Sequence, residues 1–280
     1  MAAFFAGLVA SFVALFLLFA VLERAFPGVP GQRRIRRGFW TDVTYWFVSV
    51  PLGQVVGFVA ASAAVLVAAV PFGVHLGDGG VHDWLTRDTA IGRQPAWAQV
   101  AEALVAADFI AYWMHRLFHR HRRLWPFHAV HHSSTDLDWL SSVRLHPVND
   151  ALVTFAQVLP LIAIGFRPMT VAPVTSVLVL YAIFIHANVR WSFGPLRYVI
   201  ATPVFHRWHH TSQEEGLDKN FAGFLPLWDL LFGTFYLPVG SQPARFGVRG
   251  EGPPDGWIRQ LAYPFRVRRG EGWNSSARRA

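Results

Sequence analysis

Cysteine is absent from the 280 residues, and charged residues are scarce. Without thiols the chain can form no disulfide and hold no iron–sulfur cluster, so any bound metal must be held by histidine, carboxylate or backbone oxygen. Asp, Glu, Lys and Arg make up 15% of the residues, whereas a soluble domain has about 25%. With hydrophobic residues at 53%, this composition indicates a membrane protein.

Nucleotide-binding motifs are also missing. The sequence has neither a Rossmann fingerprint nor a P-loop, so it carries no evident site for a flavin or a nicotinamide. The net charge of +8 comes from arginine, and a basic chain can bind nucleic acid. No nucleic-acid recognition motif accompanies this charge, and the arginines flank apolar runs. We therefore expect a membrane surface as the partner, and no nucleic acid.

Long apolar runs are present instead, and about 20 apolar residues span a bilayer. We expect an all-α integral-membrane bundle of about four to five spans, with a cytosolic helical cap that carries the histidine clusters. The first run is expected to be an uncleaved span and not a signal peptide, because no basic segment precedes it. The second is broken by Pro51 and Gly53 into a span and an interfacial turn. The apolar runs are Ala2–Val21, Phe39–Val70, Pro95–Met114, Val148–Ile164 and Val171–Ile185.

Arginine-rich segments separate these runs. Residues 31–38 hold four arginines and residues 115–147 hold five. By the positive-inside rule both segments face the cytoplasm. Val148–Ile164 and Val171–Ile185 are expected to form a helical hairpin, either spanning or re-entrant, that returns His186 to this side. The basic, amphipathic run Trp257–Arg269 suits a membrane surface, and the last ten or so residues are expected to form a loose tail.

Histidines occur in three short clusters with helical spacing. His115 and His119 are four residues apart, and residues 128–132 and 206–210 both have the pattern HxxHH. On a helix, residues three and four apart share a face, so each cluster is expected to point its imidazoles in one direction. Neutral imidazole suits iron, zinc, copper and nickel. The clusters predict a centre for a pair of transition-metal ions, because a disordered histidine-rich tract would not alternate with Trp, Phe and Leu.

In their order and spacing, these motifs resemble the fatty acid hydroxylase superfamily, also called the sterol desaturase family, of integral-membrane non-haem diiron oxygenases. The resemblance covers residues 108–236, and residues before it match only as membrane spans. It is carried by Asp108-x-x-x-Tyr112-Trp113-x-His115-Arg116-x-x-His119, His128-x-x-His131-His132-Ser133, Arg144-x-His146-Pro147, His186-x-Asn188, His206-x-x-His209-His210 and Trp228-Asp229-x-Leu-Phe232-Gly233-Thr234.

The resemblance implies two iron ions and O₂ as co-substrate. Some members carry a second histidine four residues before the position of His186, where this chain has Ala182. His146 is either a further ligand or a residue behind the ligands, and His75, His82 and His121 are expected to be ordinary solvated or interfacial residues. Carried over by position, the iron ligands are His115, His119, His128, His131, His132, His186, His206, His209 and His210.

Three polar residues are expected to orient the ligands by hydrogen bonds to their outer ring nitrogens: Asp108, Asn188 and Asp229. For Asp108 the alternative is a helix-end carboxylate, and for Asp229 it is a cap of a helix or turn. A set of tryptophans either excludes water from the site or forms an interfacial belt. These are Trp113, Trp139, Trp208 and Trp228.

As a member of this family, the chain would hydroxylate an unactivated C–H bond of a membrane lipid with O₂ and two external electrons. Desaturation on the same centre is the alternative, and the motifs do not separate the two. The electrons would come from a partner such as a cytochrome b5-like protein or a ferredoxin. The basic segment Arg120–Arg123 suits either an acidic donor or anionic lipid.

Two other classes of function fit histidine clusters. A metal transporter places its ligands near the bilayer midplane, whereas these clusters fall at the cytoplasmic ends of helices. A bis-histidine haem protein needs fewer histidines than the clusters supply. The expected organisation is residues 1–95 as N-terminal membrane spans, 96–240 as the catalytic domain, and 241–280 as a basic amphipathic segment and tail.

Overall fold

Helices make up nearly all of the regular structure in the computed structural model, which describes residues 2–75 and 79–267. Over those residues no β-sheet forms, and strand pairing is limited to two isolated bridges. The all-α expectation is therefore confirmed. The α-helices are α1 (Ala2–Ala25), α2 (Phe39–Thr44), α3 (Val50–Ala69), α4 (Gly80–Leu85), α5 (Ala96–Arg120), α6 (Trp125–Ala129), α7 (Pro147–Ile164), α8 (Pro168–His186), α9 (Pro203–His209), α10 (Leu227–Leu231) and α11 (Trp257–Arg266).

Six short helices of other types connect these elements. The π-helix η1 (Tyr45–Ser49) joins α2 to α3, and five 3-10 turns lie elsewhere. They are η2 (Val70–Phe72), η3 (His131–Ser133), η4 (Trp139–Val143), η5 (Gly194–Tyr198) and η6 (Glu214–Gly216).

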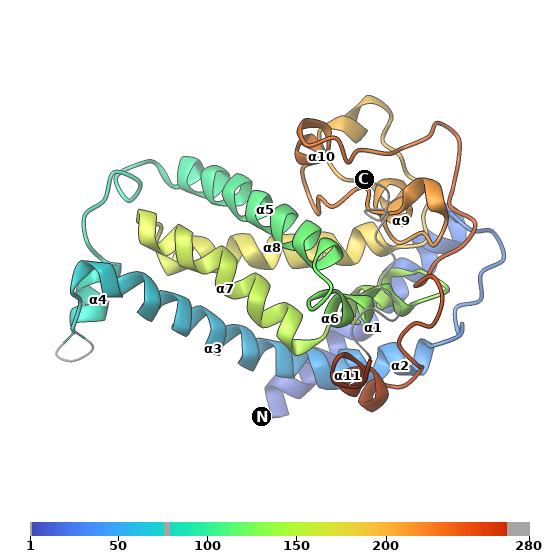
Figure 1. Ribbon diagram of the computed structural model, residues 1–280, viewed down its shortest axis with the longest axis horizontal. Coiled ribbons are helices and arrows are strands. Elements are labelled where there is room, and N and C mark those ends of the chain that lie inside the picture. Colours follow the sequence, from blue (N-terminus) through green and yellow to red (C-terminus); the bar gives the residue numbers. More distant parts are fainter. Residues whose placement is uncertain (1, 76–78, 268–280) are drawn as a thin grey trace.

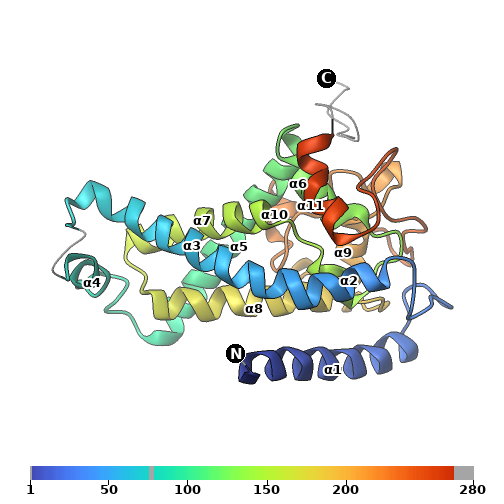
Figure 2. The same ribbon diagram turned by 90° about the horizontal axis from the view of Figure 1, so that it is seen from below.

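The long helices run side by side between two ends of the molecule (Figure 1). α3 and α7 lead away from the histidine-bearing cap, whereas α5 and α8 return to it, and α4 lies at the opposite end. α1 lies along one side (Figure 2), where Phe12 packs on Trp46 and Phe19 stacks on Trp139. Helical direction therefore brings the ends of α5 and α8 into the cap, and with them His115, His119 and His186.

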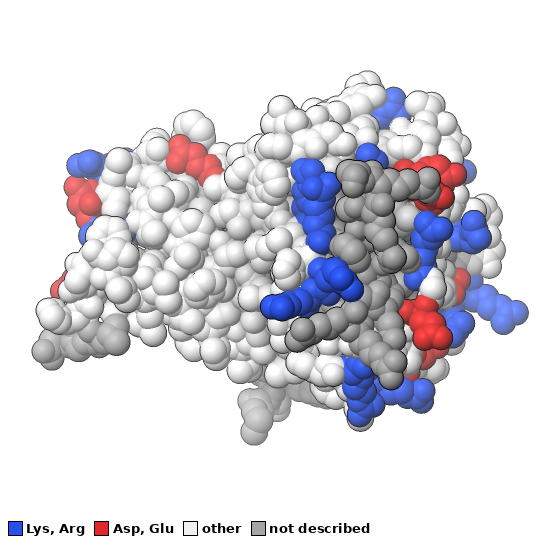
Figure 3. All heavy atoms as spheres, in the orientation of Figure 1, with Lys and Arg blue, Asp and Glu red and all other residues white. Residues whose placement is uncertain are grey.

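Within the described residues, four helical segments are long and apolar enough to cross a bilayer: residues 2–25, 39–72, 147–164 and 168–186. These candidates agree with the lower value of the expected four to five spans. α5 is not among them, yet it runs the length of the bundle with Ala103 and Ala107 fully buried. On the face seen in Figure 3, charged side chains gather at the two ends and leave an uncharged belt between them. This arrangement is the one that a membrane-spanning bundle requires.

Residues 39–72 form one continuous helical segment, so the expected interfacial turn at Pro51–Gly53 is wrong. Proline lacks an N–H group, and its ring collides with the carbonyl group of the preceding turn. Here η1 ends at Ser49, two residues before Pro51, and its π-turn widens the helix in the turn that the proline ring would meet. The hairpin of α7 and α8 forms as expected, with Gly165 at φ 110° in its turn.

A buried ionic cluster ties the start of α2 to the cap. The Arg36 guanidinium donates to Asp42 at 2.7 Å and to Asp138, and Arg144 donates to the other oxygen of Asp42. Arg144 also donates to Ser133, next to His132, at 3.2 Å. These four charged side chains are at most 7% exposed. The N-terminal helices and the cap are therefore one packed unit, although far apart in sequence.

The C-terminal helix α11 packs against α6 in the cap. Phe265 meets Phe127 edge to face, and Gln260 donates to Ser133 at 3.2 Å. Of the amphipathic run expected at 257–269, residues 268 and 269 lie outside the described residues, as does the expected loose tail.

Candidate metal centre

Nine histidines converge in the cap as two adjacent groups. Within each group, the possible ligand atoms all lie within 4.8 Å of one another. Eight of the nine side chains are buried, and His115 is partly buried. Histidine group A is His115, His119, His128, His132 and His209, and histidine group B is His131, His186, His206 and His210. The nine histidines expected from sequence are therefore the nine that the fold assembles.

Each HxxHH motif divides its histidines between the two groups, so the expectation that all three point in one direction is wrong. His128 and His132, four residues apart, both enter group A, while His131 enters group B. In the second motif His206 and His210, four residues apart, enter group B, while His209 enters group A. The rings of His132 and His210 stack with their centroids 4.3 Å apart. The two motifs thus contribute to both groups and hold them side by side.

The Nε2 atoms point inward and crowd together in a way that hydrogen bonds alone do not satisfy. A neutral imidazole nitrogen is either one donor or one acceptor. The Nε2 atom of His132 nevertheless lies 3.1 to 3.2 Å from the Nε2 atoms of three other rings, those of His119, His128 and His209. In group B, Nε2 atoms in the chain His131, His186, His206 and His210 are 3.0 to 3.2 Å apart. A cation in each group would satisfy these lone pairs together.

The outer Nδ1 atoms fix the ring tautomers that metal binding requires. Four of them face oxygen acceptors at 2.6 to 3.0 Å. A carbonyl oxygen only accepts, so these Nδ1 atoms carry the proton and leave the Nε2 lone pair free for a metal. The pairs are His115 with Phe221 O, His128 with Asn149 Oδ1, His186 with Ala182 O and His209 with Lys219 O. The Nε2 atom of His115 is buried with no hydrogen-bond partner, as expected for an atom that binds a metal.

Burial keeps these rings neutral. Desolvation, the largest cause, lowers the pKa of His115 to about 4. Desolvation together with repulsion from neighbouring imidazoles lowers the pKa of His119, His132 and His209 well below 6.5. Because a lowered histidine pKa favours the unprotonated ring, the cluster is neutral at pH 7 and available as ligands.

None of the three predicted orienting residues bonds a ring directly. Asp108 accepts from the backbone N–H groups of Phe224 and Leu225 and from Trp228 Nε1, at 2.9 to 3.0 Å. Asn188 pairs with both backbone groups of Val29, at 2.8 and 3.2 Å. The hydrogen bonds of both side chains therefore fix loops and not imidazoles.

Asp229 acts on a ligand through one intermediate. Its carboxylate accepts from the N–H groups of Phe221 and Ala222, both at 2.8 Å. The carbonyl oxygen of Phe221 is the partner of His115 Nδ1. The turn-cap reading of Asp229 is thus the better description, and the turn that it caps presents a carbonyl to a histidine.

His146 lies outside both histidine groups. Its Nδ1 accepts from Val148 N at 3.1 Å as the N-cap of α7, and its Nε2 faces Leu261 O at 3.2 Å. Both ring nitrogens are therefore used. His75, His82 and His121 are exposed and belong to neither group.

The aromatic wall of the site differs from the predicted one. Trp125 lies against group A, with its ring 4.9 Å from His119 and 5.6 Å from His132. Of the four predicted tryptophans, Trp113 is 41% exposed, and Trp139 packs in the core with Phe19. The sequence does not distinguish the tryptophan at the site from the one in the core, because Trp125 and Trp139 both lie close to histidines along the chain.

Asn149 and Asp218 are the polar neighbours that sequence reasoning missed. Asn149 Oδ1 accepts from His128 at 3.0 Å, and Asp218 Oδ1 lies 3.6 Å from His119 Nδ1. A signal for Asn149 existed, because an amide in the first turn of an apolar span is costly unless it has a partner. Asp218 lies in a loop at φ 54°, and no periodicity marks it.

Replacing Asn149 by alanine should weaken metal binding. His128 would lose the acceptor that fixes its tautomer, and loss of such a partner costs about 10- to 100-fold in metal affinity or activity. Metal retained per chain after dialysis against a graded series of chelator concentrations measures the effect. The exposed amide Gln54 on α3 gives the matched control, Gln54→Ala, which should keep wild-type affinity. Equal retention by both variants would contradict this role.

A narrow cavity of about 30 Å³ reaches group A from the cap surface. It touches His119, His132 and His209 and is otherwise lined by Trp125 and by residues of the loops 211–218 and 247–249.

Residues 100–234 match the family model described as fatty acid hydroxylase. The chain is 34% identical to an ornithine lipid hydroxylase of Rhizobium tropici over 61% of this chain and 51% of that protein. It is 37% identical to the human alkylglycerol monooxygenase over 48% of this chain and 29% of that protein. A very-long-chain aldehyde decarbonylase of Oryza sativa subsp. japonica is 33% identical over 45% of this chain and 21% of that protein. The chain thus spans about half or less of these relatives, and no solved structure matches significantly.

Proposed function

Because the chain belongs to the fatty acid hydroxylase family through residues 100–234, we propose that it is a membrane-bound non-haem diiron oxygenase that hydroxylates a C–H bond of a lipid. The reaction consumes one O₂, two electrons and two protons per lipid, and it yields the alcohol and water. One observation carries the proposal: nine imidazoles, eight of them buried and one partly buried, converge in two adjacent groups, and within each group the possible ligand atoms lie within 4.8 Å of one another.

Group A would hold one iron and group B the other. When bound, the irons supply the oxidising power that an unactivated C–H bond demands. The protein supplies ligands with a free Nε2 lone pair, because carbonyl and amide oxygens hold the proton on Nδ1. Trp125 and Phe221 pack on the ring of His119 and narrow the access of water to group A.

The electrons would come from a separate protein, a cytochrome b5-like protein or a ferredoxin. The sequence has no motif for a redox cofactor of its own, and the cap carries exposed arginines that would attract an acidic donor. We propose that the cap faces the cytoplasm, since the arginine-rich segments 31–38 and 115–147 both belong to it.

Hydroxylation is preferred to desaturation because relatives are named as a lipid hydroxylase and a monooxygenase. Their names make ornithine lipids and alkylglycerols the first substrates to test. A transporter is disfavoured, because both histidine groups lie in the cap and not midway along the bundle.

Metal analysis and product mass test this function. The detergent-purified protein should contain about two irons per chain. With a chemical or protein electron donor and ¹⁸O₂, a lipid substrate should gain one ¹⁸O atom. Loss of two hydrogens without oxygen gain would instead establish a desaturase. A Soret band, or metal flux into proteoliposomes that depends on His131, would overturn the oxygenase proposal.

A further inference from the structure

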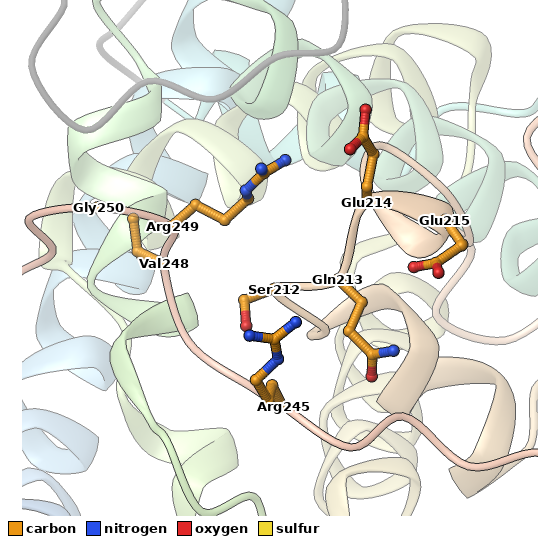
Figure 4. Close-up of a pocket in the computed structure, with 8 residues that line it drawn as sticks. All are labelled: Ser212, Gln213, Glu214, Glu215, Arg245, Val248, Arg249 and Gly250. Atoms are coloured by element: carbon orange, nitrogen blue, oxygen red, sulfur yellow. The ribbon is translucent and has the colours of Figure 1, made fainter.

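A wide polar pocket of about 460 Å³ opens on the cap beside the cavity that reaches group A (Figure 4). Its charged and polar lining comes from two separate segments of the chain. These contribute Ser212, Gln213, Glu214, Glu215, Arg245 and Arg249. Two arginines and two glutamates therefore surround one hollow.

The floor of this pocket is built into the fold. Thr211 and Phe246 form an isolated antiparallel bridge, and the Arg245 carbonyl oxygen accepts from Ser212 N at 3.0 Å and from Thr211 Oγ1 at 2.9 Å. The side chain of Gln213 accepts from Ala244 N. These bonds hold the segments 211–215 and 244–250 at a fixed separation, so the hollow between them is preformed.

Two charged side chains of the pocket, Glu215 and Arg245, come one from each segment and are exposed. Over residues 2–75 and 79–267, neither of these two forms an ion pair. Figure 4 shows the Arg249 guanidinium extending toward Glu214 from the opposite wall. A ligand with a single sign of charge would meet repulsion from one of the two pairs, whereas a ligand with both signs can use each pair.

The pocket adjoins the narrow cavity that reaches group A. Val248 and Arg249 line both the wide pocket and the narrow cavity that touches His119, His132 and His209. A molecule with its polar end in the wide pocket is therefore held next to the histidines. Since the narrow cavity holds only about 30 Å³, the rest of a bound lipid requires local opening around Val248 and Leu217.

We propose that this pocket binds the zwitterionic head group of the lipid substrate. Arg245 and Arg249 bind its anionic group, a phosphate or a carboxylate, and Glu214 and Glu215 bind its ammonium group. That the bound lipid is a substrate rests on the proposed function, but binding of its head group can be measured without turnover.

Binding and turnover of three lipids with the same acyl chains test the assignment. Short-chain phosphatidylethanolamine is zwitterionic, phosphatidylglycerol is anionic, and diacylglycerol is neutral. Calorimetry on the iron-loaded protein should show the zwitterionic lipid binding about tenfold more tightly than the other two. Glycerophosphoethanolamine, the same head group without acyl chains, should compete with it. Arg245→Gln and Glu215→Gln should each raise the Kd and KM for the zwitterionic lipid about tenfold, with kcat and iron content unchanged.

Exposed charges at the opposite end of the molecule supply the controls. Arg93→Gln and Glu102→Gln should leave all three affinities at the wild-type value. Equal affinity for the three lipids, or pocket variants that bind the zwitterionic lipid as tightly as the controls do, overturns the head-group assignment. If calorimetry shows the expected selectivity and the iron-loaded protein oxidises no lipid, the assignment of the pocket is supported and the proposed function is what fails.

Discussion

Replacing His132 by alanine is expected to remove iron and to abolish lipid hydroxylation. The Nε2 atom of His132 is the point at which His119, His128 and His209 converge, each within 3.2 Å. Its ring also stacks on His210 of group B, so both groups lose a neighbour. Mutation of a residue that hydrogen-bonds a metal ligand lowers metal affinity or activity about 10- to 100-fold. Mutation of a central ligand should therefore lower it more than about 100-fold. Iron content and ¹⁸O incorporation measure the loss.

His121 provides the control for this variant. It lies in the cap two residues after His119, but it is exposed and belongs to neither histidine group. His121→Ala should retain iron and activity. An iron-replete, fully active His132→Ala protein would refute the assignment of group A as a metal site. Alanine at His115, His131, His209 or His210 should have the same effect as alanine at His132.

Replacing Asp42 by alanine should strongly destabilise the protein, although Asp42 lies in α2 and belongs to neither histidine group. Its carboxylate bonds both Arg36 and Arg144, and all three side chains are at most 1% exposed. Arg36 would keep Asp138, but Arg144 would lose its only carboxylate among these contacts. Removing one partner of a buried pair costs about 3–5 kcal/mol. For a chain of this size, the midpoint of thermal unfolding should fall on the order of 10 °C.

The exposed pair between Arg37 and Asp255 is the matched comparison. Their side chains are 73% and 49% exposed, and pairs of this kind contribute about 0–1 kcal/mol. Asp255→Ala should therefore leave the unfolding midpoint almost unchanged. The same small shift for Asp42→Ala would mean that the buried cluster does not hold the N-terminal helices to the cap.

The sequence predicted the membrane helices well, because long apolar runs reflect the demand of the bilayer directly. α5 shows where that reasoning weakens. Its Glu102 and Asp108 lower its hydropathy, but its small residues Ala103 and Ala107 let neighbouring helices cover it. Burial by other helices is a tertiary property, and the composition of one segment does not report it.

The ligand histidines could be identified from spacing, but their division into two groups could not. The helical argument places His128, His131 and His132 on one face. In the structure α6 ends at Ala129 and a 3-10 turn begins at His131, which rotates His131 toward His186. The orienting partners were missed for a related reason. Polar side chains are visible in a sequence, whereas the backbone carbonyl groups that face His115 and His209 are positioned only by the path of the loops.

That path has an evolutionary consequence. Every residue offers a carbonyl group, so mutations that change the side chains of Ala182, Lys219 or Phe221 need not disturb the protons on the imidazoles that these residues face. Selection would then act on the course of the main chain and leave side-chain identity at these positions free to drift. A site built in this way can exchange the side chains around its histidines while the protons on the imidazoles stay in place.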